Sequence, residues 1–196
     1  MKFYLDSDWF IDTAEFIDLS IGVATHGVRA WYLDYPRITP VMEHGFVGSV
    51  ALGGAVNFRD IYFNPHGHGT HTESHGHISK EVYPVSHCFN QFFFDAQLIT
   101  IIPDIIGGDR VITAEQLRDL SPCDALVIRT EPNYLSKSTT NYSDTNPTYM
   151  DVACVDIINE CGIKHLLVDI PSVDKEIDGG ILAFHHAFWN VPENPV

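Results

Sequence analysis

The chain is poor in several features that would assign a protein to a common functional class. It contains only 11 Lys and Arg against 26 Asp and Glu, which gives a formal net charge of −15. Such a charge repels phosphate backbones and anionic lipids, so it argues against nucleic-acid and membrane partners. No run of about 18 apolar residues is present to form a membrane-spanning helix. Acidic residues near the N-terminus are atypical of a signal peptide, so we expect a cytoplasmic protein.

Cysteine pairs and the common catalytic signatures are missing as well. The four cysteines are spread out and form no C-x-x-C pair, which leaves a zinc ribbon or a dithiol redox site unsupported. No G-x-S-x-G turn indicates a serine nucleophile, and no glycine-rich phosphate loop follows a strand. The chemistry must therefore come from other residues.

Histidine is concentrated in one short internal segment. Residues 66–77 read HGHGTHTESHGH and hold five of the eleven histidines. Histidine is the commonest metal ligand and shuttles protons near neutral pH, and glycine permits tight turns. Because the segment has almost no apolar side chain to bury, we interpret it as a loop built around a metal or catalytic site. A solvated polar loop and incidental metal capture by clustered imidazoles are the alternatives.

The spacing within this segment limits which side chains can share one ion. His71 and Glu73 are two residues apart, so an extended chain points both to the same side. His77 has the same parity, but six residues of strand span about 20 Å, too far for one ion to touch both ends. The chain must therefore turn after Glu73, with Gly76 as the expected position, or His77 has a role different from that of His71.

Here the sequence resembles the cyclase family that includes bacterial kynurenine formamidase and isatin hydrolase. Its signature, His-x-Gly-Thr-His-x-Asp-x-x-x-His, is similar to the run from Gly69 to Glu73 followed by His77. Further matches occur in the family's order: Asp18-Leu19-Ser20, then Asp169-Ile170-Pro171-Ser172-Val173-Asp174, then His185-His186. The resemblance covers most of the chain, from about Phe16 to His186.

The resemblance implies a metal-dependent hydrolase that cleaves an amide or formamide C–N bond of a small aromatic substrate. Imidazole and carboxylate ligands suit Zn²⁺ as the preferred ion, with Mn²⁺ as the alternative. A bound ion lowers the pKa of its water to about 7, as this hydrolysis requires. In this reading His71, Glu73 and His185 are metal ligands, with His186 as the alternative to His185, and His77 is the general base. The resemblance also implies a homodimer or a higher homo-oligomer.

Two other functions remain open for the same residues. The first is a catalytically impaired protein that binds a metal or a small molecule without turnover. The second is a lyase or a cyclising enzyme, because hydrolysis and cyclisation both require a polarised carbonyl and a base.

The chain departs from the family pattern in two places. The family's first histidine falls on Gly67, so His66 and His68 compete for one metal position. We expect His68 to bind after a turn at Gly69, with His66 as outer support. The family's last acidic ligand has no clear counterpart, because the chain stops soon after His186 and Glu193 is flanked by prolines. This predicts a missing ligand or a C-terminally truncated chain.

We expect residues 1–196 to form one α/β domain, with a mixed β-sheet flanked by helices. The resemblance implies a swivelling β/β/α-like fold. Apolar, β-branched runs predict buried strands at 97–102, 125–130 and 165–170, some of them parallel. Capping patterns predict helices at 113–120 and 151–161, the second ended by Gly162. The predicted irregular segments are an aromatic stretch at 25–48, a candidate pocket wall, and a loop at 131–149, either functional or a disordered insertion.

Overall fold

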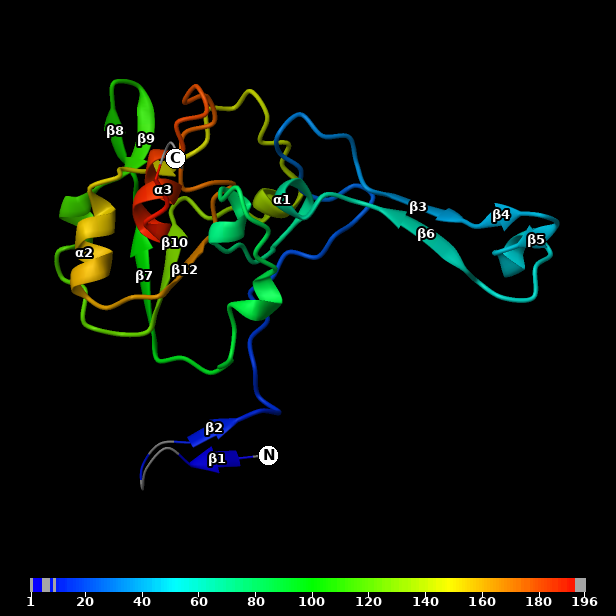
Figure 1. Ribbon diagram of the computed structural model, residues 1–196, viewed down its shortest axis with the longest axis horizontal. Helices are drawn as coiled ribbons and strands as arrows, with labels where there is room; N and C mark the ends of the chain where they lie inside the picture. The colour runs from blue at the N-terminus through cyan, green and yellow to red at the C-terminus, as the bar shows by residue number, and fades with distance from the viewer. Residues whose placement is uncertain (1, 5–7, 9, 193–196) are drawn as a thin grey trace.

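A body with a central sheet carries two projecting β-ribbons in the computed structural model, which describes residues 2–4, 8 and 10–192. One ribbon is a long arm and the other is an N-terminal hairpin (Figure 1). No helix among these described residues has the length and apolar character to cross a membrane.

The central sheet consists of the three strands that the sequence predicts. β10 (Ala125–Thr130) lies between β7 (Ala96–Ile101) and β12 (His165–Val168), and both neighbours run parallel to it. Parallel neighbours need long crossover connections, which here carry the helical segments between them. The prediction of parallel strands is therefore confirmed.

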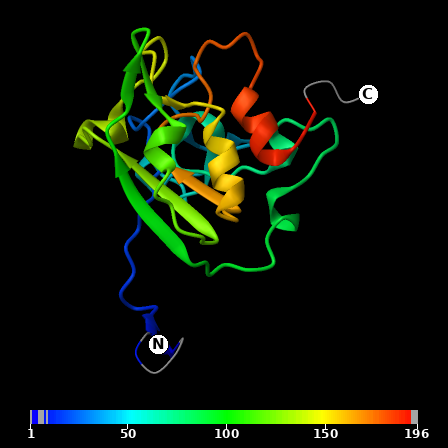
Figure 2. The ribbon, with the colours of Figure 1, turned by 90° about the vertical axis from the view of Figure 1, so that its left-hand side faces the viewer.

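One face of this sheet holds the hydrophobic core. The core cluster joins alternate strand residues, among them Leu126 and Ile128, to Ile158 of α2 (Cys154–Glu160) and Phe184 of α3 (Ala183–Trp189). The two helices lie side by side on the same side of the sheet (Figure 2). The predicted helix at 151–161 begins at Cys154, after a turn in which the Asp151 side chain accepts the Ala153 N–H at 2.8 Å, as a capping residue does. Its end at a left-handed glycine is confirmed by Gly162, whose φ is 72°.

A second three-stranded sheet in the body contains one antiparallel pair of strands and one parallel pair. β8 (Asp104–Ile106) and β9 (Asp109–Ile112) form a hairpin, and β11 (Tyr149–Met150) pairs with β9 in parallel. The capping pattern at Thr113 opens only a short 3-10 helix, Ala114–Leu117, in place of the predicted helix at 113–120. The α/β class is confirmed; the central sheet is wholly parallel, and the mixed strand directions occur within the second sheet. The swivelling fold stays a prediction.

The arm occupies residues that the sequence left as irregular structure. β3 (Arg37–Pro40) and β6 (Arg59–Tyr62) pair in antiparallel fashion, and β4 (Met42–Glu43) and β5 (Phe46–Val47) form the hairpin beyond them. The arm projects away from the body (Figure 1), so Phe46 of the predicted aromatic stretch lies apart from it, whereas Trp31 of the same stretch stays in the body, where it lines a small hollow with Tyr142 and its Nε1–H donates to the His66 carbonyl at 3.0 Å. A 3-10 turn, Val50–Leu52, lies between β5 and β6. The N-terminal hairpin pairs β1 (Lys2–Tyr4) with β2 (Phe10–Asp12).

The predicted long loop at 131–149 is held against the body by several contacts. Lys137, in a 3-10 turn at Leu135–Thr139, donates from Nζ to Asp169 Oδ2 at 2.7 Å and to Thr130 Oγ1 at 2.8 Å. Arg29 and Asn141 form an isolated parallel bridge. The loop is therefore tied to the carboxyl ends of β10 and β12, which argues against a disordered insertion.

Candidate metal centre

The histidine-rich segment is folded more regularly than a loop. α1 (Pro65–His68) is a single helical turn, and a 3-10 turn follows at His75–His77. Asn64 caps α1, because its Oδ1 accepts the His66 N–H at 3.0 Å, and Pro65 is suited to the first helical position. The prediction of a loop across 66–77 was therefore wrong for residues 66–68, which belong to α1.

Helical geometry at α1 separates the two competing histidines. His68 points into the body and is 2% exposed, with both ring nitrogens engaged. Its Nδ1 accepts the Asn64 N–H, and its Nε2–H donates to the Asp34 carbonyl, each at 2.8 Å. His66 points the other way, towards Glu73. The geometry thus corrects the expected preference for His68, because residues two apart on a helical turn cannot face the same way.

Gly67 faces a surface that leaves no room for the family's histidine. A Cβ atom at this position would lie 2.5 Å from Leu33 Cδ1 and 3.1 Å from the Ala30 carbonyl oxygen. The Gly67 carbonyl also accepts the Ala30 N–H at 3.0 Å, which fixes the backbone there. A side chain at position 67 would not fit this backbone, and His66 is the neighbouring histidine whose ring reaches Glu73.

Gly69 lets a second segment approach the histidines. Its φ is 151°, and a Cβ atom there would lie 2.8 Å from the Ile21 carbonyl oxygen. The Thr70 N–H donates to that carbonyl, and the Ile21 N–H donates back to Thr70 Oγ1 at 2.8 Å. The segment that begins with Asp18 thereby supports the chain just before His71.

Four imidazoles surround the carboxylate of Glu73. His66 Nδ1 lies 2.5 Å and His71 Nε2 lies 3.0 Å from Glu73 Oε1. His77 Nε2 is 3.8 Å from the same oxygen, whereas His185 Nε2 is 3.5 Å from Oε2. The donor atoms form two groups that share Glu73, one with His66 and His71 and one with His77 and His185, each within 4.8 Å. Either group could hold a divalent ion, since both combine imidazole with carboxylate.

The turn that brings His77 back to Glu73 follows directly after Ser74. The His77 N–H donates to the Ser74 carbonyl at 2.8 Å, which confirms the predicted turn after Glu73. Glycine is needed at position 76 because the Tyr83 backbone packs closely against it: a Cβ atom there would lie 2.4 Å from the Tyr83 carbonyl oxygen. His77 then stacks on His66 with ring centroids 4.3 Å apart.

Asp174 orients His185, a role that the spacing alone does not reveal. The His185 Nδ1–H donates to Asp174 Oδ2 at 2.5 Å, so Nε2 is left to face Glu73. Asp174 also accepts the backbone N–H groups of Phe184 and His185 at the start of α3. Carboxylates that hold a ligating histidine in this way fix its tautomer and ring orientation. The signal in the sequence was the run ending at Asp174 together with the downstream histidine pair.

The remaining histidines near the centre lie outside both donor groups. The His186 Nδ1–H donates to the Val191 carbonyl at 2.7 Å, so His185 is the member of the pair that reaches the cluster. The His75 ring packs on Tyr83. Glu193, the candidate for a final acidic ligand, lies outside the described residues.

The cluster has strongly perturbed electrostatics. Burial alone would raise the pKa of Glu73, but hydrogen bonds with His185 and His71 outweigh it and hold that pKa well below its ordinary value. Burial opposes protonation of His185, yet hydrogen bonds with Asp174 and Glu73 raise its pKa to about 9. Burial lowers the pKa of His77, although Glu73 opposes the shift. The hydrogen bond with Glu73 is the main cause that raises the pKa of His71.

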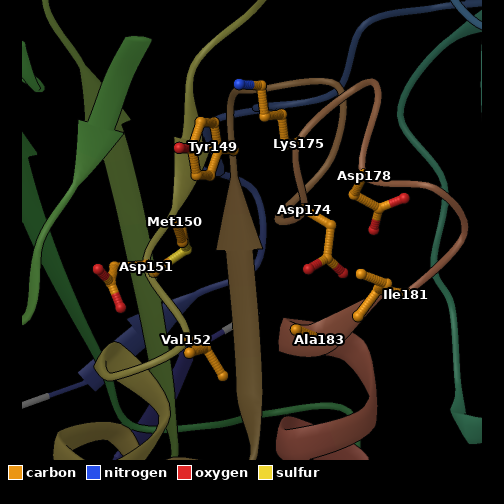
Figure 3. A pocket seen from close by; sticks show the side chains of 9 residues that line it. All are labelled: Tyr149, Met150, Asp151, Val152, Asp174, Lys175, Asp178, Ile181 and Ala183. Atoms are coloured by element: carbon orange, nitrogen blue, oxygen red, sulfur yellow. The ribbon is translucent and has the colours of Figure 1, made fainter. Parts of the chain in front are cut away.

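A cavity lies beside the cluster, and its lining includes Asp174, which contacts His185. It has a volume of about 280 Å³ and lies between Met150 and Val152 on one side and Ala183 at the start of α3 on the other (Figure 3). None of the five donor residues lines it. The candidate metal centre is thus a half-buried cluster beside this cavity, and its donor atoms do not line the cavity.

Comparison with known families agrees with the motifs. Residues 17–175 match the family described as Putative cyclase, a span that includes the histidine-rich segment and ends before His185. No curated protein matches the chain. Membership suggests a metal-dependent, hydrolase-like role, and the cluster around Glu73 is a possible metal site. Since the match covers most of the sequence, the chain belongs to the Putative cyclase family.

Proposed function

We propose that the protein is a metal-dependent hydrolase that cleaves an amide or formamide bond of a small, aromatic substrate, as an arylformamidase does. The observation that carries the proposal is the convergence of four imidazoles on one carboxylate, Glu73. Protonated imidazoles at such distances would repel one another, so a bound cation that keeps them neutral satisfies the cluster better than protons do.

The first donor group is the better candidate for the principal ion. His66, His71 and Glu73 come from one short segment that α1 and the Thr70–Ile21 pairing hold in place. The His71 Nδ1 lies 3.0 Å from the Gly69 carbonyl and donates to it, which directs Nε2 towards the cluster. Zn²⁺ is the preferred occupant and Mn²⁺ the alternative, and such an ion would polarise a carbonyl and acidify water when bound.

His77 is suited to move the proton in this reaction. Burial keeps its pKa below the ordinary value, so the ring is neutral and able to accept a proton near neutral pH. Its ring stacks on His66, and its Nε2 lies 3.8 Å from Glu73 Oε1, so it is beside the first donor group. A base at this position takes a proton from water and returns it to the leaving amine.

His185 completes the far side of the centre. The contact from Asp174 and the start of α3 hold it rigidly, and its Nε2 faces the second carboxylate oxygen of Glu73. In the hydrolase it acts as a further ligand or as a fixed donor to a substrate oxygen.

The test combines metal analysis with turnover of a simple substrate. The purified chain, supplied with Zn²⁺ or Mn²⁺, should bind about one ion per chain and hydrolyse a formylated aromatic amine such as formanilide. His71→Ala should lose both properties, whereas His75→Ala, a histidine of the same segment outside both donor groups, should keep them. Absence of bound metal at micromolar supply contradicts the proposal.

Metal binding without turnover is the second candidate function. It is favoured by the position of the larger cavity, which none of the cluster donors lines. Stoichiometric metal in the wild-type chain, together with no hydrolysis across a panel of formamides and amides, would select this function over the first.

A further inference from the structure

The cavity beside Asp174 takes no part in the proposed hydrolysis. Its volume of about 280 Å³ lies near the lower end of the range of about 300–1,000 Å³ that ligand pockets occupy, so its occupant must be small. Much of its wall is hydrocarbon, from Met150 and Val152 on one side and from Ile181 and Ala183 on the other (Figure 3). Val152 and Ile181 are also exposed to solvent, so a ligand can enter past these two side chains.

The charged side chains of the lining favour a positively charged occupant. They are three aspartates and one lysine, Asp151, Asp174, Asp178 and Lys175, so three carboxylates against one ammonium leave a formal charge of −2. The ammonium is also committed elsewhere, because Lys175 Nζ donates to Asp109 Oδ2 at 2.6 Å and Asp109 is not part of the lining. The cavity therefore repels anions and attracts cations, and the net charge of −15 on the chain adds to this field.

Asp174 is the buried acid of this lining, and it has room for one more donor. Its side chain is part of a residue only 9% exposed. Its Oδ2 accepts both the backbone N–H and the ring Nδ1–H of His185, at 3.2 and 2.5 Å, whereas Oδ1 accepts the Phe184 N–H at 2.8 Å. A carboxylate offers about four acceptor positions, so one position on Oδ1 is unused among the residues that the structure describes. A buried charge of this kind is stabilised by a further donor, above all a charged one.

We propose that the cavity binds a small organic cation, a primary alkylammonium ion whose N–H donates to Asp174 and whose short hydrocarbon chain lies between Met150 and Ile181. A quaternary ammonium ion has no N–H to donate, and the Tyr149 ring that could receive it already lies 5.9 Å from Lys175 Nζ. A Ca²⁺ or Mg²⁺ ion needs about six oxygen ligands, which the hydrocarbon walls do not supply. The mixture of apolar walls and one buried carboxylate therefore selects an amine with an apolar tail.

The amine site is separate from the candidate metal centre, although Asp174 contacts both. Its Oδ2 holds the ring of His185, and the ammonium ion takes the open position on Oδ1, so the two contacts are compatible. At pH 7 an alkylamine is protonated, as a lysine side chain is, and has no lone pair to offer a metal ion. Binding of the amine therefore reports on the cavity alone and does not depend on the proposed hydrolase activity.

Calorimetric titration of the full chain with n-butylammonium chloride, at pH 7 in an amine-free buffer, tests the site. The ion should bind saturably at millimolar concentrations, with about one ion per chain. 1-Butanol has a tail of the same length but no charge, so it should bind at least about tenfold more weakly, and butyrate should not bind. Absence of saturable butylammonium binding, or 1-butanol binding of equal affinity, overturns the proposal.

Two variants with matched controls locate the bound ion. Asp174→Asn keeps the size of the side chain but removes its charge, and should weaken butylammonium binding at least about tenfold, whereas Asp156→Asn, at an exposed acid outside the lining, should not. Val152→Phe fills part of the cavity from an exposed position, so it remains a valid test if Asp174→Asn does not fold; it should weaken binding to a similar degree, whereas Ile177→Phe, an exposed apolar residue outside the lining, should not. Affinity unchanged by Val152→Phe overturns the cavity as the site, and affinity unchanged by Asp174→Asn overturns the carboxylate as its anchor.

Discussion

His68 and His66 are only two positions apart, but their replacement by alanine should affect different properties of the protein: fold stability for His68 and metal binding for His66. His68 is 2% exposed and joins the Asn64 N–H to the Asp34 carbonyl, whereas the His66 side chain is 40% exposed and contacts Glu73. His68→Ala should therefore destabilise the fold, and His66→Ala should weaken metal binding.

The magnitudes follow from the contacts that each change removes. His68→Ala removes a buried ring and two partly buried hydrogen bonds, each worth about 0.5–1.5 kcal/mol, so the free energy of unfolding should fall by roughly 2–3 kcal/mol. His66→Ala removes a half-exposed ring and should cost less than about 1 kcal/mol without metal. Its metal affinity should fall at least about a hundredfold, since loss of even an outer partner costs about 10- to 100-fold.

Two measurements separate these effects. Urea denaturation in the presence of a chelator gives the free energy of unfolding of each metal-free variant, and calorimetric titration with Zn²⁺ gives the affinity. If His68→Ala abolished metal binding while the metal-free protein kept wild-type stability, His68 would be a ligand and the geometric assignment of His66 would be refuted.

Three further changes test the surrounding residues. His77→Ala should retain metal and lose turnover; loss of the ion to the same degree as in His71→Ala, measured by elemental analysis, would make His77 a ligand. Asp174→Ala should lower metal affinity about 10- to 100-fold by releasing His185, and should lower the free energy of unfolding by about 2–4 kcal/mol because two buried N–H groups at the start of α3 lose their acceptor, whereas an unchanged titration would contradict its orienting role. Gly67→His should not restore a ligand but should destabilise the chain by about 1–3 kcal/mol in denaturation, because the Cβ atom meets Leu33; a stable variant with tighter metal binding would contradict this.

The sequence predicts the central sheet well because its strands bury apolar residues in continuous runs. β10 occupies 125–130 as predicted, and β7 and β12 differ from their predicted ranges by one or two residues at an end. The arm leaves no comparable pattern. Its strands are only two to four residues long and bury no face within the chain, so neither apolar runs nor alternation mark them.

The error at His68 has a physical cause that the sequence could have disclosed. The expectation for His68 relies on a turn at Gly69, whereas Asn64-Pro65, a capping residue followed by a good first helical residue, predicts a helical turn across 66–68. Recognition of that helical turn would have placed His66 and His68 on different sides. The contact between Asp174 and His185 is harder to foresee, because it depends on the loop geometry that brings residue 174 to the start of α3.

Glu73 is the residue on which both donor groups depend. Its two oxygens face different histidines: His66, His71 and His77 lie on the side of Oε1, and His185 lies at Oε2. A single carboxylate can neutralise only one unit of positive charge, whereas four imidazoles would carry four if all were protonated. Burial lowers the pKa of His77, whereas hydrogen bonds with Asp174 and Glu73 raise that of His185 to about 9 despite its burial, so the metal-free cluster favours a neutral His77 and a protonated His185. The same asymmetry separates a proton acceptor from a fixed donor within one centre, which is the division of roles that hydrolysis of an amide requires.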